Sequence, residues 1–406
     1  MTNFTANERA HMALALALAE RGLFTTRPNP RVGCVLAHGD EVVGTGWHQK
    51  AGTPHAEVHA LAAAGPNARG ATAYVTLEPC AHFGRTPPCA DALIAAGVAR
   101  VVAACVDPFP QVAGLGLARL AAAGIASDFG LMHEQARALN AGFFSRIERA
   151  RPWLRLKLAM SIDGRTAPIA NAVQTQAGQT PEARARRWLT GPAAQRDVHR
   201  LRARACAVLT GIETVLADDP GLDVRLDPAD CPDMPDVSLA QDLPDVSLAR
   251  DLSVPAPLKI VLDRQLRTPA SAKLFGTPGA VLIVHGPTAP EPQRARLRAA
   301  GAELWQLPAA EPEQLPALFA ELGKREINEV HTEAGATLCG ALLHAGLVDE
   351  LVLYQAPILL GDQARPLFAL PGLSMLHDRI QLELLEQRAF GPDLRFRYRC
   401  IHSVLR

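Results

Sequence analysis

The sequence TLEPCAHFGRTPPC at residues 76–89 decides the fold of the first part of the chain. It is interpreted together with an upstream triplet, His55-Ala56-Glu57. Cys80, Cys89 and His55 can supply three ligands to a tetrahedral zinc ion, which leaves one position open for water. Bound zinc lowers the pKa of such a water molecule to about 7. Because Glu57 follows His55 too closely to be an easy fourth ligand, we expect it to carry protons to and from that water.

The order of these motifs is typical of zinc-dependent nucleobase deaminases, in which His-x-Glu precedes Pro-Cys and a second cysteine. The usual pattern has two residues between the cysteines, whereas residues 81–88 separate them here. The triplet opens an Ala-rich helix, Pro79-Cys80 ends an apolar strand and Cys89 opens another helix, which favours a metal site over chance core packing. A structural zinc site usually has four protein ligands, and no fourth candidate here is placed as these three are, so we expect a catalytic zinc. His59 is the best spare ligand, although one turn after His55 it could equally face the core.

Strands and helices alternate on both sides of this stretch, which predicts an α/β fold with the zinc ligands at one edge. Residues 146–152 are charged, and Pro152 precedes a new apolar strand, so we place a domain boundary there. The expected elements are helices 6–21, 55–64, 90–96 and 115–123, and strands 32–37, 41–47, 71–77, 101–106 and 125–129.

Length and charge limit the possible functions. With 406 residues the chain suggests two or three domains. Lys+Arg and Asp+Glu both total 41, so there is no electrostatic signal for nucleic acid. The eight cysteines are irregularly spaced, which argues against a disulfide framework. No stretch has the roughly 20 apolar residues that a membrane span needs. We therefore predict a cytoplasmic protein without membrane or nucleic-acid partners.

The second half begins with an expected strand at 153–160 and a polar turn, residues 161–166. Further strands are expected at 206–210, 259–263, 281–285 and 328–333, and helices at 191–203, 293–300 and 311–323. We interpret most arginines of helix 191–203 as a solvated face, and Asp218-Asp219 before Pro220 as turn formers. Residues 170–187 and 227–256 are expected to be surface insertions, the second containing a tandem repeat of PDVSLAxDL.

The sharpest signal in this half is TEAGATLCG at residues 332–340. A strand ends there, a glycine permits close backbone approach, and an apolar helix begins at about Thr337. The free N–H groups of such a helix start suit the phosphates of a dinucleotide. Helix packing also requires small residues, however, and the standard GxGxxG fingerprint is absent.

Residues 1 to about 146 resemble the deaminase half of the bifunctional riboflavin-biosynthesis deaminase–reductase family. The matching motifs are Pro28–Gly33, Gly44–His48, His55–Glu57, the 76–89 stretch and Asp107–Pro110. The resemblance implies a cytidine-deaminase-like α/β/α domain with His55, Cys80 and Cys89 as zinc ligands and Glu57 as the proton carrier. It also implies that Asn29 and His48 hold a pyrimidine ring and that Asp107 holds a ribose.

The residues of the loop between the cysteines indicate a phosphate site. His82, Arg85 and Thr86 offer an imidazole, a guanidinium fork and a hydroxyl within a few residues, a set that suits a phosphate. The family resemblance implies the same role, a grip on the phosphate of the substrate. The alternative for Arg85 is an ordinary solvated loop charge.

Residues 153 to about 400 resemble the reductase half of the same family, which is similar to dihydrofolate reductase in fold. The matching motifs are Lys157–Ala159, Ser161–Thr166, Trp188–Thr190, Thr214–Pro220, Arg225 and Glu333–Gly335. The resemblance implies that NADPH contacts Ala159, Trp188, Thr214, Asp218, Gly335, Ala336, Thr337, Leu338, Cys339, Gly340 and Ala341. It implies that the sugar phosphate contacts Arg202, Leu222, Arg225 and Glu333.

Lys157 and Asp163 are candidates for polarising or protonating the ribose carbonyl. Arg186 and Arg264 stand where the family has small polar residues, and we assign no role to them.

We therefore predict a zinc-dependent deaminase domain (1–146), a linker (147–152) and an NADPH-dependent reductase domain (153–406). The two domains would deaminate 2,5-diamino-6-(5-phosphoribosylamino)pyrimidin-4-one and then reduce its ribosyl group to a ribityl group. By resemblance we expect a homo-oligomer, with a dimer favoured. Two alternatives stay open at this point: a deaminase acting on nucleosides or tRNA, and a zinc-stabilised binding module without catalysis.

Overall fold

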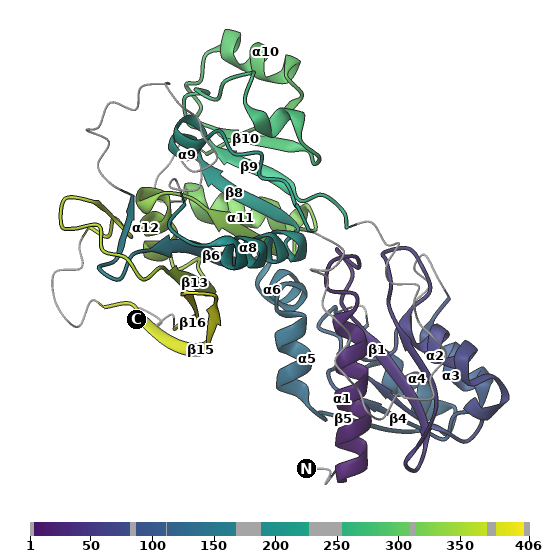
Figure 1. Cartoon of the computed structure of the whole chain (residues 1–406). Helices are drawn as coiled ribbons and strands as arrows, with labels where there is room; N and C mark the ends of the chain where they lie inside the picture. Colours follow the sequence, from purple (N-terminus) through teal and green to yellow (C-terminus); the bar gives the residue numbers. More distant parts are fainter. Residues whose placement is uncertain are drawn as a thin grey trace. The chain divides into compact units, whose positions relative to one another are not determined.

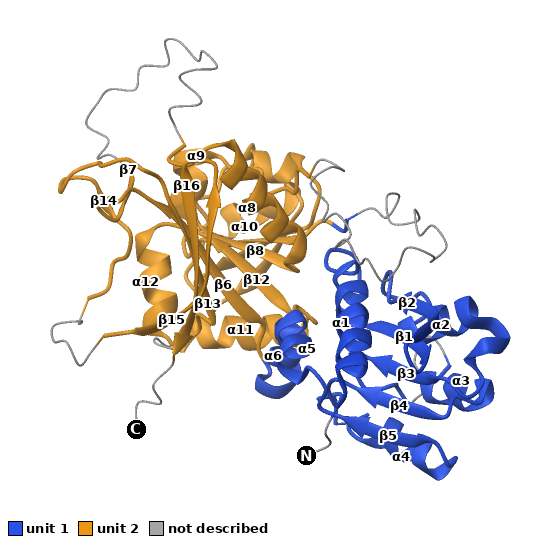
Figure 2. Cartoon of the chain, turned by 60° about the horizontal axis from the view of Figure 1, so that its bottom comes forward, with its two compact units in different colours: residues 1–150, 231–255 blue, residues 151–230, 256–406 orange. Residues whose placement is uncertain are grey.

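The computed structural model describes residues 4–81, 87–110, 112–167, 188–226, 254–308, 313–371 and 379–401. These residues form two compact units (Figures 1 and 2). Unit 1 runs through Ala150, and unit 2 begins at Arg151 and holds the rest of the described chain except Val254 and Pro255. The domain limits assigned from the sequence stay predictions. Most of both expected insertions, 170–187 and 227–256, lies outside the described residues.

Unit 1 is built on a five-stranded sheet in the order β2-β1-β3-β4-β5. Strand β1 pairs antiparallel with β2 and β3, and the remaining pairs are parallel. The strands are β1 (Gly33–His38), β2 (Glu41–Trp47), β3 (Thr72–Val75), β4 (Arg100–Ala103) and β5 (Ala126–Phe129). The carboxyl ends of β3 and β4 therefore lie side by side, at the edge where residues 76–80 and 104–110 leave the sheet.

Helices cover both faces of this sheet, so unit 1 has the expected α/β/α layers (Figure 2). Successive residues of β1 face opposite sides: Val35 packs in one core cluster and Leu36 in the other. The first cluster includes side chains from α1 (Ala6–Glu20), α5 (His133–Leu139) and α6 (Ala141–Arg149). The second contains α2 (Ala56–Ala64), α3 (Cys89–Ala96) and α4 (Leu115–Ala122).

Unit 2 is built on a nine-stranded sheet in the order β11-β10-β9-β8-β12-β6-β13-β16-β15. The seven strands from β11 to β13 are parallel, and β16 and β15 continue the sheet antiparallel. The strands are β6 (Trp153–Met160), β8 (Ala207–Gly211), β9 (Leu258–Leu262), β10 (Val281–His285), β11 (Ala302–Gln306), β12 (Glu329–Glu333), β13 (Glu350–Gln355), β15 (Gln381–Phe390) and β16 (Asp393–Ile401). Short strands β7 (Arg165–Ala167) and β14 (Arg365–Pro366) form a separate pair.

Both faces of this sheet are also covered. Helices α11 (Gln314–Lys324) and α12 (Ala336–His344) pack against Leu154, Leu156 and Leu158 of β6. On the opposite face α9 (Ile212–Asp218) and α10 (Glu291–Ala299) cover β9 to β11, and α8 (Pro192–Arg204) packs on Val352 and Tyr354 of β13. Parallel strands buried on both faces need such apolar runs.

The face under α8 carries a buried ionic network rather than a purely apolar core. Arg155 is 1% exposed and donates to Glu350 at 3.0 Å and to Glu329 at 3.3 Å. Glu329 also accepts from Arg204 at 2.8 Å, and Glu350 also accepts from Arg397 at 2.6 Å. The expectation that most arginines of α8 form a solvated face is therefore wrong for Arg204, because a carboxylate of the sheet holds it.

Several elements were not expected from the sequence. They are α5, α6, α9, β7, β11, β13, β14, β15 and β16. Residues 212–218 form a helix, so Asp218 is its last residue rather than part of a simple turn, and Asp219 follows it with φ 43°. None of the described helices is long and apolar enough to cross a membrane.

Replacing Arg155 with alanine should destabilise unit 2 strongly, because Glu329 and Glu350 would each lose a cation while staying buried. Removing one partner of a buried ion pair costs about 3–5 kcal/mol. We expect a loss of about 3 kcal/mol in the free energy of unfolding, the lower end of that range, since Arg204 and Arg397 remain. Urea unfolding followed by a probe in unit 2 measures it.

Arg399→Ala is the matched control in the same sheet, because its pair with Glu383 is half exposed. That substitution should cost less than about 1 kcal/mol. Equal losses for the two variants would show that the buried network is not what stabilises this sheet.

Candidate functional site

The structure brings the three predicted zinc ligands of unit 1 together. The ligand atoms of His55, Cys80 and Cys89 all lie within 4.8 Å of one another. His55 Nδ1 lies 3.0 Å from Cys89 Sγ and 3.7 Å from Cys80 Sγ, and the Cys89 backbone N–H donates to Cys80 Sγ at 3.3 Å. One histidine and two cysteines at this spacing suit a zinc ion that keeps an open position.

The elements that carry these ligands fix their positions. His55 is the N-cap of α2, Cys89 is the first residue of α3, and Cys80 follows β3. Helix α2 can start against β2 only because Gly46 has no side chain, since a Cβ there would lie 2.3 Å from the carbonyl oxygen of Ala56. The sequence therefore sets the position of His55 partly through a glycine on the neighbouring strand.

The thiol of Cys80 is prepared for a metal by its surroundings. Its hydrogen bond with the Cys89 side chain is the largest cause that lowers the pKa of Cys80 to about 4, and His55 lowers this pKa further. The thiolate is the form of cysteine that binds metal ions. The same hydrogen bond raises the pKa of Cys89, so the pair shares one proton, which a metal ion bound to both sulfur atoms would displace. A histidine and two cysteines are ligands that zinc prefers.

Glu57 lies beside this cluster with a carboxyl group that is almost fully buried. The residue is 3% exposed, and its Oε2 has no hydrogen-bond partner among the described residues. Burial raises the pKa of Glu57 to about 7, against the opposing influence of His55. A carboxyl group with this pKa can both accept and release a proton near neutral pH.

Asn29 and His48 form a polar pair next to the cluster. The His48 and His55 rings are 5.3 Å apart between centroids and nearly perpendicular. His48 Nδ1 lies 3.2 Å from the carbonyl oxygen of Pro54, so it carries the hydrogen, and Nε2 then accepts from the Asn29 amide at 3.1 Å. Burial lowers the pKa of His48 to about 4, which keeps the ring neutral at pH 7.

The remaining predicted residues of unit 1 are placed only in part. Asp107 lies in the loop after β4, and its Oδ1 accepts the backbone N–H of Phe109 at 2.8 Å. Its own backbone N–H donates to the carboxylate of Glu78 at 3.1 Å. His82, Arg85 and Thr86 lie outside the described residues. Sequence reasoning missed Glu78, although an acid directly before Pro79-Cys80 at the end of a buried strand was a signal that it needs partners.

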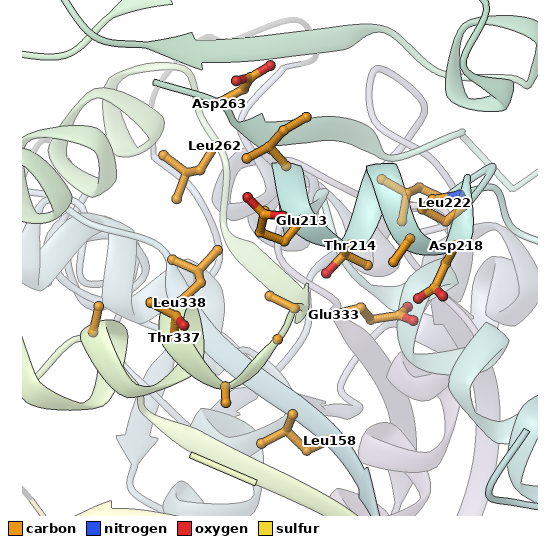
Figure 3. A pocket seen from close by; sticks show the side chains of 18 of the residues that line it. Leu158, Glu213, Thr214, Asp218, Leu222, Leu262, Asp263, Glu333, Thr337 and Leu338 are labelled. Carbon is orange, nitrogen blue, oxygen red and sulfur yellow. The ribbon is translucent and has the colours of Figure 1, made fainter. Parts of the chain in front are cut away.

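Unit 2 contains a cavity of about 2130 Å³ at the carboxyl ends of its parallel strands (Figure 3). Ligands of open α/β sheets bind at this edge. The start of α12 borders the cavity, with Gly335 as N-cap and no side chain capping its first N–H groups. The predicted residues that line it are Lys157, Ala159, Trp188, Arg202, Thr214, Asp218, Leu222, Arg225, Glu333, Gly335, Ala336, Thr337, Leu338 and Ala341.

Arg202 and Glu333 form an ion pair in the wall of this cavity. Arg202 donates to both carboxylate oxygens of Glu333, at 2.5 and 2.9 Å, and Arg202 is 7% exposed. Burial raises the pKa of Glu333, but the charge and hydrogen bonds of Arg202 outweigh it and hold the pKa well below its usual range. Burial lowers the pKa of the Lys157 ammonium group, and Glu333 opposes that shift. Arg202 thus belongs to the cavity wall rather than to a solvated face.

Three predicted residues do not line the cavity. The Asp163 carboxylate instead accepts the backbone N–H groups of Leu360, at 3.2 Å, and Gly361, at 2.7 Å. Cys339 is fully buried and donates to the carbonyl oxygen of Ala334. Gly340 permits close packing, since a Cβ there would lie 1.8 Å from the carbonyl oxygen of Ala369.

Arg264 and His199 also line the cavity. Arg264 lines the cavity and donates to Gln314 at 2.9 Å, whereas Arg186 lies outside the described residues. His199 also lines it, and sequence reasoning missed this residue. Its Nδ1 accepts the Arg225 backbone N–H at 3.1 Å, and its Nε2 lies 3.3 Å from the Arg225 guanidinium. No local pattern distinguished it from the other polar residues of α8.

Comparisons with known proteins agree with both units. Residues 5–105 match the family model for the cytidine and deoxycytidylate deaminase zinc-binding region, and residues 152–396 match the RibD C-terminal domain. The riboflavin biosynthesis protein RibD of Escherichia coli (strain K12) is 47% identical, over 97% of this chain and 98% of that protein. The chain belongs to the RibD family. Its relative from Haemophilus influenzae is 45% identical over 98% and 99% of the two chains.

Solved structures of the RibD family share the whole fold. Acinetobacter baumannii RibD, form 1, superposes with a TM-score of 0.81 at 40% identity and covers 98% of this chain and 99% of that chain. A diaminohydroxyphosphoribosylaminopyrimidine deaminase/5-amino-6-(5-phosphoribosylamino)uracil reductase from Thermotoga maritima gives 0.74 at 25% identity, over 97% and 99% of the chains.

The chain is therefore a bifunctional deaminase and reductase of the riboflavin pathway, and the predictions of fold and function are confirmed. Membership of the RibD family excludes the alternative of a binding module without catalysis. It equally overturns the alternative of a nucleoside or tRNA deaminase with an incidental second half. A zinc-binding deaminase domain and a RibD reductase domain imply zinc and a nicotinamide cofactor.

Cys89→Ser should remove most of the zinc from the purified protein, because a hydroxyl group is a poor substitute for a thiolate ligand. Metal analysis should give about one zinc ion per chain in the unchanged protein and much less in the variant. Cys105→Ser is the matched control, since Cys105 is a buried thiol of the same unit outside the cluster. Equal zinc contents in the two variants would contradict the ligand assignment.

Proposed function

We propose that unit 1 deaminates 2,5-diamino-6-(5-phosphoribosylamino)pyrimidin-4-one and that unit 2 reduces the ribosyl group of the deaminated product with NADPH. The observation that carries the first half is Glu57, which is buried, interacts with His55, Cys80 and Cys89, and keeps one carboxylate oxygen without a hydrogen-bond partner among the described residues. The second half is supported by the cavity that joins the start of α12 to Lys157 and Glu333. The relative from Thermotoga maritima bears the names of both reactions.

In unit 1 each side chain of the site has a distinct role. His55, Cys80 and Cys89 would hold a zinc ion, which would lower the pKa of a bound water molecule and so supply hydroxide near neutral pH for attack on the ring carbon that bears the 2-amino group. Glu57 takes the proton of that water and passes it to the departing ammonia, which its pKa of about 7 allows in both directions. Asn29 and the neutral His48 hold the pyrimidine ring, and Asp107 holds the ribose. His82, Arg85 and Thr86 grip the phosphate.

In unit 2 the chemistry that NADPH would supply, when bound, is a hydride for the ribose carbonyl carbon. Trp188, Thr214, Asp218 and the α12 start would hold the cofactor, since the unpaired N–H groups of a helix start bind phosphate. Arg202, Leu222, Arg225 and Glu333 bind the sugar phosphate. Lys157, whose pKa burial lowers, is placed to polarise the carbonyl oxygen and protonate it. We propose that Asp163 holds the backbone at Leu360 and Gly361 and takes no part in catalysis.

We further propose a homodimer joined through unit 2. Strand β15 exposes Leu382, Leu384 and Leu385 at the end of the sheet, with exposed fractions of 41, 53 and 39%. Exposed leucines on a strand at the edge of a sheet are typical of a site for association. Sedimentation of the purified protein would show a monomer if the proposed dimer is wrong.

We also propose a cytoplasmic location, because all cysteines that the structure describes are free thiols.

Glu57→Ala should abolish ammonia release and leave the reductase intact. The loss should reach about 10²–10⁴-fold, the range for a general acid–base residue. Ammonia release is measured with the diaminopyrimidinone substrate, and NADPH oxidation with substrate that has already been deaminated. A variant that still deaminates at the normal rate would refute the role of Glu57, and one that also loses NADPH oxidation would point to misfolding.

Thr337→Asp should weaken NADPH binding without weakening the fold. Thr337 is an exposed residue in the first turn of α12 and lines the cavity. A carboxylate there stabilises a helix by about 0.3–1 kcal/mol but repels the phosphates of the cofactor. We expect a rise of at least about tenfold in the dissociation constant, or about 1.4 kcal/mol, by cofactor fluorescence titration. Unchanged affinity would contradict the assignment of the α12 start.

A further inference from the structure

Glu78 of unit 1 carries a buried carboxylate that binds four backbone N–H groups. The residue is 3% exposed. Its Oε1 accepts from Gly116 at 2.9 Å and Leu117 at 3.2 Å, and its Oε2 accepts from Gly114 at 3.0 Å and Asp107 at 3.1 Å. Each oxygen of this carboxylate therefore accepts two backbone hydrogen bonds.

The four bonds join two segments that both border the deaminase site. Glu78 precedes the predicted zinc ligand Cys80 by two residues, and its own backbone N–H donates to Cys105 at 2.8 Å. The donors lie in the loop and helix start that follow β4, from Asp107 to Leu117. Three of these donors, in Gly114, Gly116 and Leu117, would otherwise be unpaired at the start of α4.

The two segments also touch through their backbones. A Cβ on Gly116 would lie 1.9 Å from the carbonyl oxygen of Pro79, so the α4 start packs directly on the residue before Cys80. Arg119 of α4 adds a hydrogen bond to the carbonyl oxygen of Ala81 at 3.2 Å and an ion pair with Asp91 of α3. Because the carboxylate is the common acceptor, it ties both the Asp107 backbone and the α4 start to the Cys80 segment.

We propose that Glu78 is a positioning residue of the deaminase, which holds Asp107 at a fixed place relative to the metal cluster so that Asp107 can bind the ribose. The proposal rests on the proposed function of unit 1. Glu78 acts through the backbone of Asp107 and does not touch the substrate. A network that only stabilised the fold would influence unfolding but would not be coupled to Asp107.

Glu78→Gln is the informative substitution, because an amide of nearly the same shape keeps one accepting oxygen and turns an NH₂ group toward two N–H donors. Loss of the hold on Asp107 removes binding that the ground and transition states share, which raises KM and leaves kcat nearly unchanged. We expect KM for ammonia release to rise about tenfold or more, with kcat within about threefold and zinc content unchanged.

A double-mutant cycle separates positioning from general stability. Asp107→Ala alone should raise KM to a similar extent, and the Glu78→Gln/Asp107→Ala variant should be no worse than the poorer single variant. Glu8→Gln is the matched control in unit 1: it removes the charge that pairs with Arg100, while the amide oxygen can keep the capping box of α1, so it should lower the unfolding midpoint slightly without changing KM.

Three results would overturn the proposal: multiplied effects in the double variant, an unchanged KM in Glu78→Gln, or loss of zinc in that variant. The last result would show that Glu78 serves the Cys80 segment instead of Asp107. Failure of the proposed function is distinguishable, because the unchanged protein would then release no ammonia from the diaminopyrimidinone at all. NADPH oxidation with deaminated substrate should stay normal in every variant and reports that unit 2 is folded, whereas the zinc content reports on unit 1.

Discussion

Parallel strands place their carboxyl ends along one edge of a sheet, and both sites of this chain depend on that constraint. In unit 1 the ends of β3 and β4 bring Cys80 and Asp107 to the same edge, where the starts of α2 and α3 add His55 and Cys89. In unit 2 the ends of β6, β8, β9 and β12 border the cavity, and α12 begins there. Loops and helix starts can then carry reactive groups while the strands stay apolar.

Each site holds its charged groups by pairing them with partners from distant parts of the chain. Arg202 pairs with Glu333 in the cavity wall of unit 2, and Glu78 holds the Asp107 loop in unit 1. Buried charges are costly unless they are paired and hydrogen-bonded. The same rule explains the Arg155 network beneath α8, where carboxylates of two strands surround one guanidinium group. Glu57 differs, because its unpaired oxygen lies beside the metal ligands.

The sequence predicted those features that local patterns encode. His55, Cys80 and Cys89 stand at element starts and ends, so their meeting at one edge follows from the alternation of strands and helices. Strands β15 and β16 were not predicted, although apolar and charged residues alternate along β16, which is a strand pattern. Which strand they pair with is decided by contacts within the completed sheet. Arg202 was interpreted partly as solvent-facing because its partner Glu333 is 131 residues away. Glu78 escaped notice for the same reason, since its donors lie 29 to 39 residues further along the chain.

The central claim is that the two units act in order on one molecule. The most direct measurement supplies the purified protein with the phosphoribosyl-diaminopyrimidinone and NADPH and follows ammonia and NADPH together. The account predicts that ammonia appears first and that NADPH oxidation follows after a lag and reaches the same amount. Without NADPH, ammonia should still be released in full. NADPH oxidation that precedes ammonia, or proceeds without it, would contradict the account.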